Sequence, residues 1–252
     1  MVECRYSRLV DDDVHLLAAA KLTKSLRVTG IRDDGMHLIE AEMVKLDLYD
    51  EITIRPGGED GVSFVGPHAS ADIDPHDNLV IAAARLAGVQ LSAQVVKNIP
   101  AGAGLGGGSS NAAAVLAWAG FDDVETAASI GADVAFCLVG GRAMVRGIGE
   151  IIEPLEFISE TFTVVTPNIH CSTPGVYAMW DEMGGPVGEN GNDLEPAALA
   201  FEPALRSTRD ALGNATGSTP RLAGSGSSWF VEGAFPDAGA VHHTIRAPKP
   251  LG

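Results

Sequence analysis

The sequence predicts an α+β fold in two domains, a larger one over residues 1–153 and a smaller one over residues 154–252. Three observations support this prediction. The first third of the chain has strand character, a glycine-rich loop leads into an alanine-rich helix, and a new series of strands and helices begins at Pro154. A chain of 252 residues is long enough to bury a substantial core in such a fold.

The strands expected in the first domain are separated by residues that favour turns. Arg32–Gly35 has the composition of a turn between the first two strands. The expected strands are Leu22–Thr29, Met36–Val44, Asp50–Arg55 and Leu91–Lys97, with a later hairpin through Ala143–Arg146 and Glu150–Glu153.

Two helices of the first domain are expected from their capping residues. Asp77–Asn78 can accept hydrogen bonds from the first N–H groups of a helix over Leu79–Leu86. A short helix is expected over Val124–Ile130, ended by Gly131–Asp133 and followed by the apolar stretch Val134–Val139.

The second domain shows the same kinds of signal. Thr173 suits the cap of a helix whose first turn contains Pro174. The other expected elements are the strand Phe162–Thr166, the loop Gly184–Asn192, a helix over Asp193–Ala200, the glycine turn Ala223–Ser228, and the strands Trp229–Glu232 and Ala240–Arg246.

Composition excludes several classes of function. The net charge of −16 opposes binding to nucleic acid or to acidic membranes, whereas a small phosphorylated ligand can still be held by local groups. The apolar stretch Ala112–Phe121 is about half the length needed to cross a bilayer. Cys4, Cys137 and Cys171 are few and far apart, which predicts buried free thiols. With no visible export signal, we expect a cytoplasmic protein.

Residues 98–114 carry the strongest functional signal of the chain. The glycines of Gly104–Gly108 allow successive N–H groups to turn toward one centre. Ser109 and Ser110 suit the cap of a helix running through Asn111–Ala119. A glycine-rich turn that enters a helix N-terminus holds anions, phosphate above all, so a phosphorylated ligand is expected.

Three other interpretations of this loop agree less well with its sequence. It is not a Walker A loop, because no Lys-Ser/Thr pair follows the last glycine. The spacing Gly102, Gly104, Gly107 fits a dinucleotide fold, but the residues that precede it do not form a βαβ pattern. A flexible surface turn is disfavoured, because such loops rarely end in two serines followed by an alanine helix.

Several segments in the same order resemble the GHMP small-molecule kinases and, among these, the 4-diphosphocytidyl-2-C-methyl-D-erythritol kinases of the non-mevalonate isoprenoid pathway. The similar segments are Ala19–Thr23, Val28–Gly30 with Asp34–His37, Asp77–Leu79, Pro100–Ala113, Gly131–Val134, Asn192–Glu195 and Leu222–Gly226. The resemblance implies the two-domain GHMP-kinase fold, an α/β sandwich with a left-handed-type βαβ unit in its N-terminal domain. It also implies transfer of the γ-phosphoryl group of ATP to the 2-hydroxyl of a cytidine-diphosphate-linked polyol.

The resemblance implies roles for individual residues. Asp133 would accept or orient the proton of the attacking hydroxyl, and Lys21 would neutralise charge beside it. The residues expected at ATP are Asn78, Lys97, Pro100, Gly102, Gly104, Leu105, Gly106, Gly107, Gly108, Ser109 and Ser110. Those expected at the second substrate are Thr23, Met36, His37, Thr173, Tyr177, Gly224 and Ser225, with His37 on the cytosine and Tyr177 as an aromatic wall. Magnesium is expected to arrive with ATP, without a protein-built metal site.

Without the resemblance, other interpretations of these residues stay open. Asp133 could be a carboxylate at a turn, Lys21 a solvated lysine in a strand, and Tyr177 a core residue. Asn78 could simply cap its helix and Lys97 could be a surface charge.

The chain departs from the family pattern at three places. Thr23 stands where asparagine is usual, Met36 where tyrosine is usual, and the segment Ala117–Ile130 is short. Two alternatives therefore stay open: another GHMP kinase, of the homoserine or mevalonate type, and a nucleotide-binding relative without catalysis. A monomer or a homodimer is expected in either case.

Overall fold

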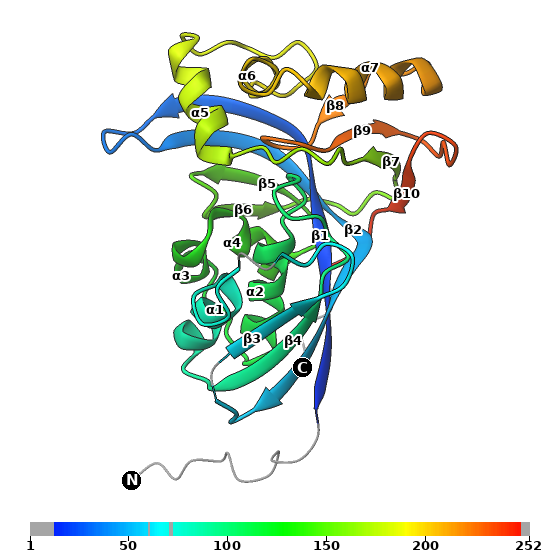
Figure 1. Ribbon diagram of the computed structural model, residues 1–252. Coiled ribbons are helices and arrows are strands. Elements are labelled where there is room, and N and C mark those ends of the chain that lie inside the picture. Colours follow the sequence, from blue (N-terminus) through cyan, green and yellow to red (C-terminus); the bar gives the residue numbers. More distant parts are fainter. Residues whose placement is uncertain (1–12, 60, 71–72, 248–252) are drawn as a thin grey trace.

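The computed structural model describes residues 13–59, 61–70 and 73–247 and is built around two antiparallel-rich sheets (Figure 1). The larger sheet has the strand order β3-β4-β2-β5-β6, with β1 paired to β2, and the smaller has the order β10-β7-β9-β8. Helices accompany both of these sheets, so the predicted α+β class is confirmed.

The larger sheet takes its strands from the first part of the chain. Its strands are β1 (Val14–Ile31), β2 (His37–Pro56), β3 (Gly61–Val65), β4 (Leu91–Val96), β5 (Arg142–Gly147) and β6 (Ile151–Pro154). β3 and β4 are parallel and are joined through a helix, whereas the other pairs are antiparallel. Helices cover one face of this sheet (Figure 1): α1 (Leu79–Ala87), α2 (Gly107–Trp118), α3 (Val124–Ala127), the 3₁₀ turn Ala128–Ile130 and α4 (Ala132–Val139).

The smaller sheet consists of β7 (Thr161–Val165), β8 (Arg221–Leu222), β9 (Trp229–Glu232) and β10 (Ala240–His243). Three helices lie on the same side of the molecule as this sheet (Figure 1): α5 (Thr173–Glu182), α6 (Glu195–Phe201) and α7 (Leu205–Thr216). We propose that the chain passes from one domain to the other after β6.

The long β1-β2 hairpin connects the two halves. It projects past the larger sheet and runs below α5 (Figure 1). Leu26 of β1 forms a bridge with Asn192, and Leu46 of β2 forms one with Thr244. A cluster of buried apolar residues from both sheets, including Leu22, Val44 and Phe230, fills the space between them. The hairpin therefore gives the two sheets a shared core.

Most elements expected from local patterns are present, but β1 begins at Val14 rather than at the predicted Leu22, and β3 was not predicted. Asn78 caps α1 as predicted, because its Oδ1 accepts from the N–H groups of Val80 and Ile81 at 3.0 and 3.2 Å. The strands predicted over Met36–Val44 and Asp50–Arg55 are one continuous strand, β2.

Two predicted caps are wrong. Helix α2 begins at Gly107 with Gly106 as its N-cap, so Ser109 and Ser110 lie inside the helix and do not cap it. Helix α5 is capped by the hydroxyl of Ser172, which accepts from Gly175, and not by Thr173.

Two helices lay outside the predictions. The apolar stretch Val134–Val139 belongs to α4, which places Asp133 in a first helical turn. Helix α7 buries only Leu205 and Leu212, so its apolar pattern is too sparse to be recognised from sequence.

Two of the three cysteines are described. Cys137 and Cys171 are free and buried, as predicted, and Cys4 lies outside the described residues. None of the described helices is both long enough and apolar enough to cross a membrane.

Candidate active site

The glycine loop connects β4 to α2 and takes a backbone that requires glycine. Gly102, Gly104 and Gly106 have φ angles of 66°, 76° and 66°, in the left-handed region that side chains disfavour. The loop enters α2 at Gly107 without a side-chain cap. The first N–H groups of a helix have no intrahelical partner, so α2 presents unpaired donors and the positive end of its dipole to the loop.

The loop also needs glycine because it packs closely against other segments. A Cβ atom on Gly106 would lie 2.7 Å from Cγ of Lys21 on β1. One on Gly104 would collide with the carbonyl oxygen of Ala223, in the second glycine turn. The loop is therefore pressed between β1 and the turn before β9, two segments distant in sequence.

A pocket of about 380 Å³ lies along this loop. It is lined by glycines of the loop, by Ser109 and Asn111 of α2, by Asp133 of α4 and by Thr173 of α5. Phe64, Ile73 and Leu79 add apolar side chains to its lining. A pocket that combines the main chain of a glycine loop with apolar side chains suits a nucleotide.

Lys21 and Asp133 form an ion pair beside the pocket, and Asp133 is the partner that lines it. Lys21 Nζ lies 3.1 Å from Asp133 Oδ2, and their side chains are 5% and 31% exposed. The same ammonium donates to Thr23 Oγ1 at 3.0 Å. Lys21 is thus a buried ion-pair partner and not a solvated strand lysine, while Asp133 remains open to the pocket.

The second glycine turn closes the site from the other side. A Cβ on Gly224 would lie 3.6 Å from Lys21 Nζ and 3.5 Å from Thr23 Oγ1, so this turn adjoins the ion pair. Thr173 Oγ1 and Ser225 Oγ are 2.8 Å apart. Four of the residues expected at the substrate (Thr23, Thr173, Gly224 and Ser225) are therefore brought together beside Lys21.

The turn is held by a residue to which the sequence analysis assigned no role. Asn192 is 2% exposed, and its Nδ2 donates to the carbonyl oxygens of Leu222 and Gly224 at 2.8 and 2.7 Å. Asn192 belongs to a segment that resembles the kinase family, but its neighbours in the sequence do not indicate that it would contact the second glycine turn.

His37 and Tyr177 are in direct contact near the turn between β1 and β2. Their ring centroids are 4.7 Å apart with an interplanar angle of 38°. The edge of the His37 ring also meets Trp180, with centroids 5.6 Å apart at 83°. At these separations a base would lie beside the His37–Tyr177 pair rather than between its rings. Met36 is 46% exposed beside them.

Tyr177 is electrostatically linked to the ion pair. Burial raises the pKa of its phenol far above the usual range, and the charge of Asp133 raises it further. Tyr177, which contacts His37, therefore lies within electrostatic range of Asp133.

Four residues expected at ATP have their functional groups engaged elsewhere. The Ser110 hydroxyl donates to the carbonyl of Ala19 at 2.6 Å and is buried, so it faces the sheet. The Leu105 side chain is 2% exposed and lies outside the pocket. Asn78 lines the pocket, but it is a helix cap whose Nδ2 also donates to the carbonyl of Asp74 at 2.9 Å.

Lys97 is the fourth of these residues, and its partner was missed. Its ammonium pairs with Asp50, and both side chains are buried, at 4% and 0% exposed. The other oxygen of Asp50 accepts from the N–H groups of Asn98 and Ile99, each at 2.8 Å. Lys97 is therefore no surface charge. It also lines the pocket, and its pair with Asp50 anchors the entrance of the glycine loop to β2.

Asn111 is a further residue that the sequence analysis did not single out. It is 1% exposed and lines the pocket, and its Oδ1 has no hydrogen-bond partner among the described residues. A buried polar atom without a partner is costly, so a ligand or a water molecule bound here would satisfy it.

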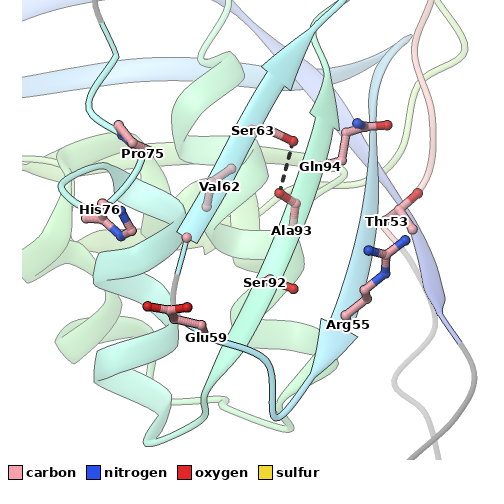
Figure 2. A pocket seen from close by; sticks show the side chains of 11 residues that line it. Thr53, Arg55, Glu59, Val62, Ser63, Pro75, His76, Ser92, Ala93 and Gln94 are labelled. Atoms are coloured by element: carbon pink, nitrogen blue, oxygen red, sulfur yellow. Dashed lines mark hydrogen bonds between the residues drawn. The ribbon is translucent and has the colours of Figure 1, made fainter.

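Two other hollows do not contain the site. One, of about 730 Å³, lies next to the glycine loop and is lined by His68, His170 and His242. The other, of about 430 Å³, lies over β2, β3 and β4, where Thr53, Ser63 and Gln94 point from the sheet (Figure 2). Neither is lined by Lys21 or Asp133.

The described residues include no group of three or more His, Cys, Asp or Glu side chains that could hold a metal ion. Among the side-chain oxygens that line the pocket, those of Ser109 and Asp133 suit a hard cation. They are the type that magnesium prefers but too few for a protein-built site, so most ligands of a bound magnesium would be phosphate oxygens and water.

Known proteins are similar to this chain in sequence and in fold. No protein-family model matches the chain. It is 37% identical over 232 residues to a 4-diphosphocytidyl-2-C-methyl-D-erythritol kinase of Paracoccus denitrificans, with 84% of each chain covered. It is 31% identical over 278 residues to the kinase of that name from Nitrobacter winogradskyi, covering 92% of this chain and 90% of the relative.

Solved structures agree in fold. A crystal structure of 4-(cytidine 5'-diphospho)-2C-methyl-D-erythritol kinase superposes with a TM-score of 0.72 and 28% identity, covering 93% of this chain and all of that one. A mevalonate kinase of L. major in complex with R-mevalonate gives a TM-score of 0.62 at 15% identity, covering 93% and 96% of the two chains. A homoserine kinase of Cytophaga hutchinsonii gives 0.58 at 17%, covering 96% and 97%.

Proposed function

The chain belongs to the 4-diphosphocytidyl-2-C-methyl-D-erythritol kinase family of GHMP kinases, and from that premise we propose the reaction that its pocket catalyses. The protein is an ATP-dependent small-molecule kinase. It phosphorylates the 2-hydroxyl of 4-diphosphocytidyl-2-C-methyl-D-erythritol, a step of non-mevalonate isoprenoid biosynthesis. The observation that carries this proposal is the Lys21–Asp133 ion pair, whose carboxylate lines a pocket formed largely by glycines.

The glycine loop is the proposed site for the phosphates of ATP. The free N–H groups at the start of α2 and the backbone of Gly102, Gly104 and Gly106 give it donors without basic side chains. Lys97 contributes by holding the loop in place through Asp50, since its ammonium is already paired. The base would lie toward the apolar lining around Leu79.

Asp133 is the proposed proton acceptor. The substrate oxygen attacks the γ-phosphorus and forms a new P–O bond, the bond to the β-phosphate oxygen breaks, and ADP leaves. The hydroxyl proton passes to Asp133, which is open to the pocket. Lys21, 3.1 Å from that carboxylate, supplies the positive charge that the transferring phosphoryl group requires.

Thr23 supports this arrangement by a simple geometric role. Its hydroxyl accepts from Lys21 Nζ at 3.0 Å and therefore holds the ammonium toward Asp133. A hydroxyl can do this as well as the amide oxygen of the usual asparagine can. We propose that the departure from the family at Thr23 preserves the lysine position.

The cytidine end of the substrate is proposed to bind at the His37, Tyr177 and Trp180 cluster. Two observations support this: the rings contact one another, and the charge of Asp133 acts on Tyr177. Trp180 supplies aromatic surface that Met36 does not. Magnesium is proposed to enter with ATP; it would shield the charge of the phosphates, with Ser109 and Asp133 nearest to it.

A coupled assay for ADP release tests the proposal. ATP is offered with 4-diphosphocytidyl-2-C-methyl-D-erythritol, with homoserine, or with mevalonate, each at several concentrations. ADP release is expected with the cytidine compound and with neither homoserine nor mevalonate. Turnover with homoserine or mevalonate instead would show a different GHMP kinase, and ATP binding by calorimetry without any transfer would show a nucleotide-binding protein.

A further inference from the structure

We propose that Asp181 is a positioning residue that decides which ring nitrogen of His37 faces a ligand, and that it thereby makes the site prefer cytosine over uracil. This inference rests on the proposed function in one respect, that the ligand is a pyrimidine nucleotide. The juxtaposition of Asp181 with His37 is independent of it.

The hydrogen bond between the two residues has one possible direction. His37 Nε2 and Asp181 Oδ1 are 2.8 Å apart. An ionised carboxylate can only accept, so Nε2 must carry the proton that is donated. A neutral imidazole has one N–H group, which leaves Nδ1 as an acceptor. Among the described residues no partner of Nδ1 is present.

Helix α5 is arranged to hold the ring in this orientation. Tyr177, Trp180 and Asp181 are at positions i, i+3 and i+4 of the helix and therefore share one face. That face meets His37 with one ring at a centroid distance of 4.7 Å, a second at 5.6 Å and the carboxylate at 2.8 Å.

Burial and a neighbouring hydrogen bond make this orientation durable. The side chain of His37 is only 12% exposed, whereas that of its partner Asp181 is 44% exposed, so the ring is enclosed by α5 while the carboxylate still reaches water. Trp180 is fixed in turn, because its Nε1 donates to the carbonyl of Pro186 at 2.9 Å.

An acceptor at Nδ1 distinguishes the two pyrimidines by hydrogen bonding. Cytosine carries an exocyclic amine, which can donate to Nδ1, whereas uracil carries a carbonyl oxygen at the same place. Two acceptors facing each other lose a hydrogen bond and leave both lone pairs unsatisfied in a partly buried site. A ring with the proton on Nδ1 would reverse this preference, so the carboxylate that sets the tautomer also sets the base.

The test compares wild type with Asp181→Asn and with Glu182→Gln. Asparagine keeps the shape of the side chain but can donate as well as accept, so it no longer imposes one tautomer. Glu182 is the exposed neighbour of Asp181 on α5, and its substitution removes the same charge without touching His37. Binding of cytidine 5'-monophosphate and uridine 5'-monophosphate is measured by calorimetry, and the histidine tautomer by ¹⁵N NMR.

Wild type and Glu182→Gln are expected to show the Nε2–H tautomer and to prefer the cytidine nucleotide. In Asp181→Asn the preference is expected to fall by about tenfold, the effect of one buried hydrogen bond, and the Nδ1–H tautomer is expected to appear. In the kinase assay KM for the cytidine substrate should rise while kcat and KM for ATP stay unchanged. A merely structural role for Asp181 would alter all three.

Two results would overturn the inference: a wild-type His37 that is protonated on Nδ1, or an Asp181→Asn protein that keeps both the tautomer and the base preference. If wild type binds neither nucleotide, the cytidine assignment fails and base selection by Asp181 fails with it. The NMR spectra then still decide whether Asp181 sets the tautomer, which separates the two failures.

Discussion

Lys21 Nζ and Asp133 Oδ2 lie 3.1 Å apart, although one residue is on the first strand of the large sheet and the other begins a helix that covers it. The lysine is almost fully buried, and the carboxylate is about one-third exposed. A pair that is closed on one side and open on the other can hold its geometry while it reaches a substrate. The catalytic proposal depends on this asymmetry.

Asp133→Asn is expected to lower kcat by about 100-fold or more, because the amide cannot take up the hydroxyl proton. Folding and ATP binding should be retained, because Lys21 keeps its hydrogen bond to Thr23 and position 133 is partly open to water, unlike the fully buried Asp50. ADP release in the coupled assay measures the effect, and calorimetry with an ATP analogue checks binding. Asp122→Asn, at an exposed position shortly before α3, is the matched control and should behave as wild type. Near-native turnover of Asp133→Asn would remove this residue from the mechanism.

Gly106→Ala and Gly120→Ala separate backbone strain from displacement of Lys21. Both glycines have left-handed φ angles, 66° and 74°, so each variant should lose roughly 1–2 kcal/mol of stability. Only Gly106 has a neighbour in the way, with the Cβ position 2.7 Å from Lys21 Cγ, whereas Gly120 has nothing within 4 Å. We expect only Gly106→Ala to lose turnover, by about 10-fold to 100-fold, as Lys21 is pushed from Asp133.

Urea unfolding and the coupled assay on the same samples check this pair of variants. Equal turnover in the two variants would show that the position of Lys21 does not depend on Gly106.

Asp50→Asn is expected to destabilise the protein by about 3–5 kcal/mol, because it leaves the Lys97 ammonium buried and unpaired. The double variant Asp50→Asn with Lys97→Met removes both charges and should recover most of that loss. Urea unfolding of the wild type, the two single variants and the double variant gives the coupling energy between Asp50 and Lys97. Glu153→Gln, which breaks an exposed ion pair with Arg146, is the control and should cost about 1 kcal/mol or less. If the losses of unfolding free energy in the two single variants simply add in the double variant, the proposed anchoring role is contradicted.

Tyr177→Phe is expected to reduce the loss of stability at alkaline pH. Burial, and then Asp133, raise the pKa of Tyr177 in the folded protein. The unfolded chain therefore loses this proton first, and stability that is complete below about pH 10 falls by up to about 1.4 kcal/mol per pH unit above it. Phenylalanine lacks this proton, so the decline should be shallower by that amount.

Urea unfolding of wild type and Tyr177→Phe between pH 8 and pH 11 measures the two slopes. The difference in stability between the two proteins should be constant below pH 9. Parallel curves over the whole range would show that Tyr177 ionises as readily in the folded protein as in the unfolded one.

Local signals predicted a large part of the fold. The Asn78 cap, the turn at Arg32–Gly35 and the hairpin of β5 and β6 depend on neighbouring residues, and all three are present. The predictions failed where distant partners change the role of a residue. Lys45 and Asp50 interrupt the apolar pattern of β2, yet both are buried there, because Lys45 donates to the carbonyl of Ala19 and Asp50 pairs with Lys97.

The failed Ser109–Ser110 cap has the same origin. Serine is a good capping residue, and nothing in the local sequence excludes that role. In the folded chain the Ser110 hydroxyl is taken by the carbonyl of Ala19 and also accepts from Lys45, while the left-handed conformation of Gly106 begins the helix earlier. Ser110 therefore does not cap the helix, because strand β1 beneath the helix provides a partner for its hydroxyl.

The sequence by itself determined the conformation of the glycine loop, because glycine at Gly102, Gly104 and Gly106 permits a left-handed backbone. It also determined the order of the motifs and hence the family. Only the tertiary structure decided that Lys21 faces Asp133 and that His37 donates to Asp181. These pairs join β1 to α4 and β2 to α5, and their distances follow from how sheets and helices pack, which no local pattern of residues encodes.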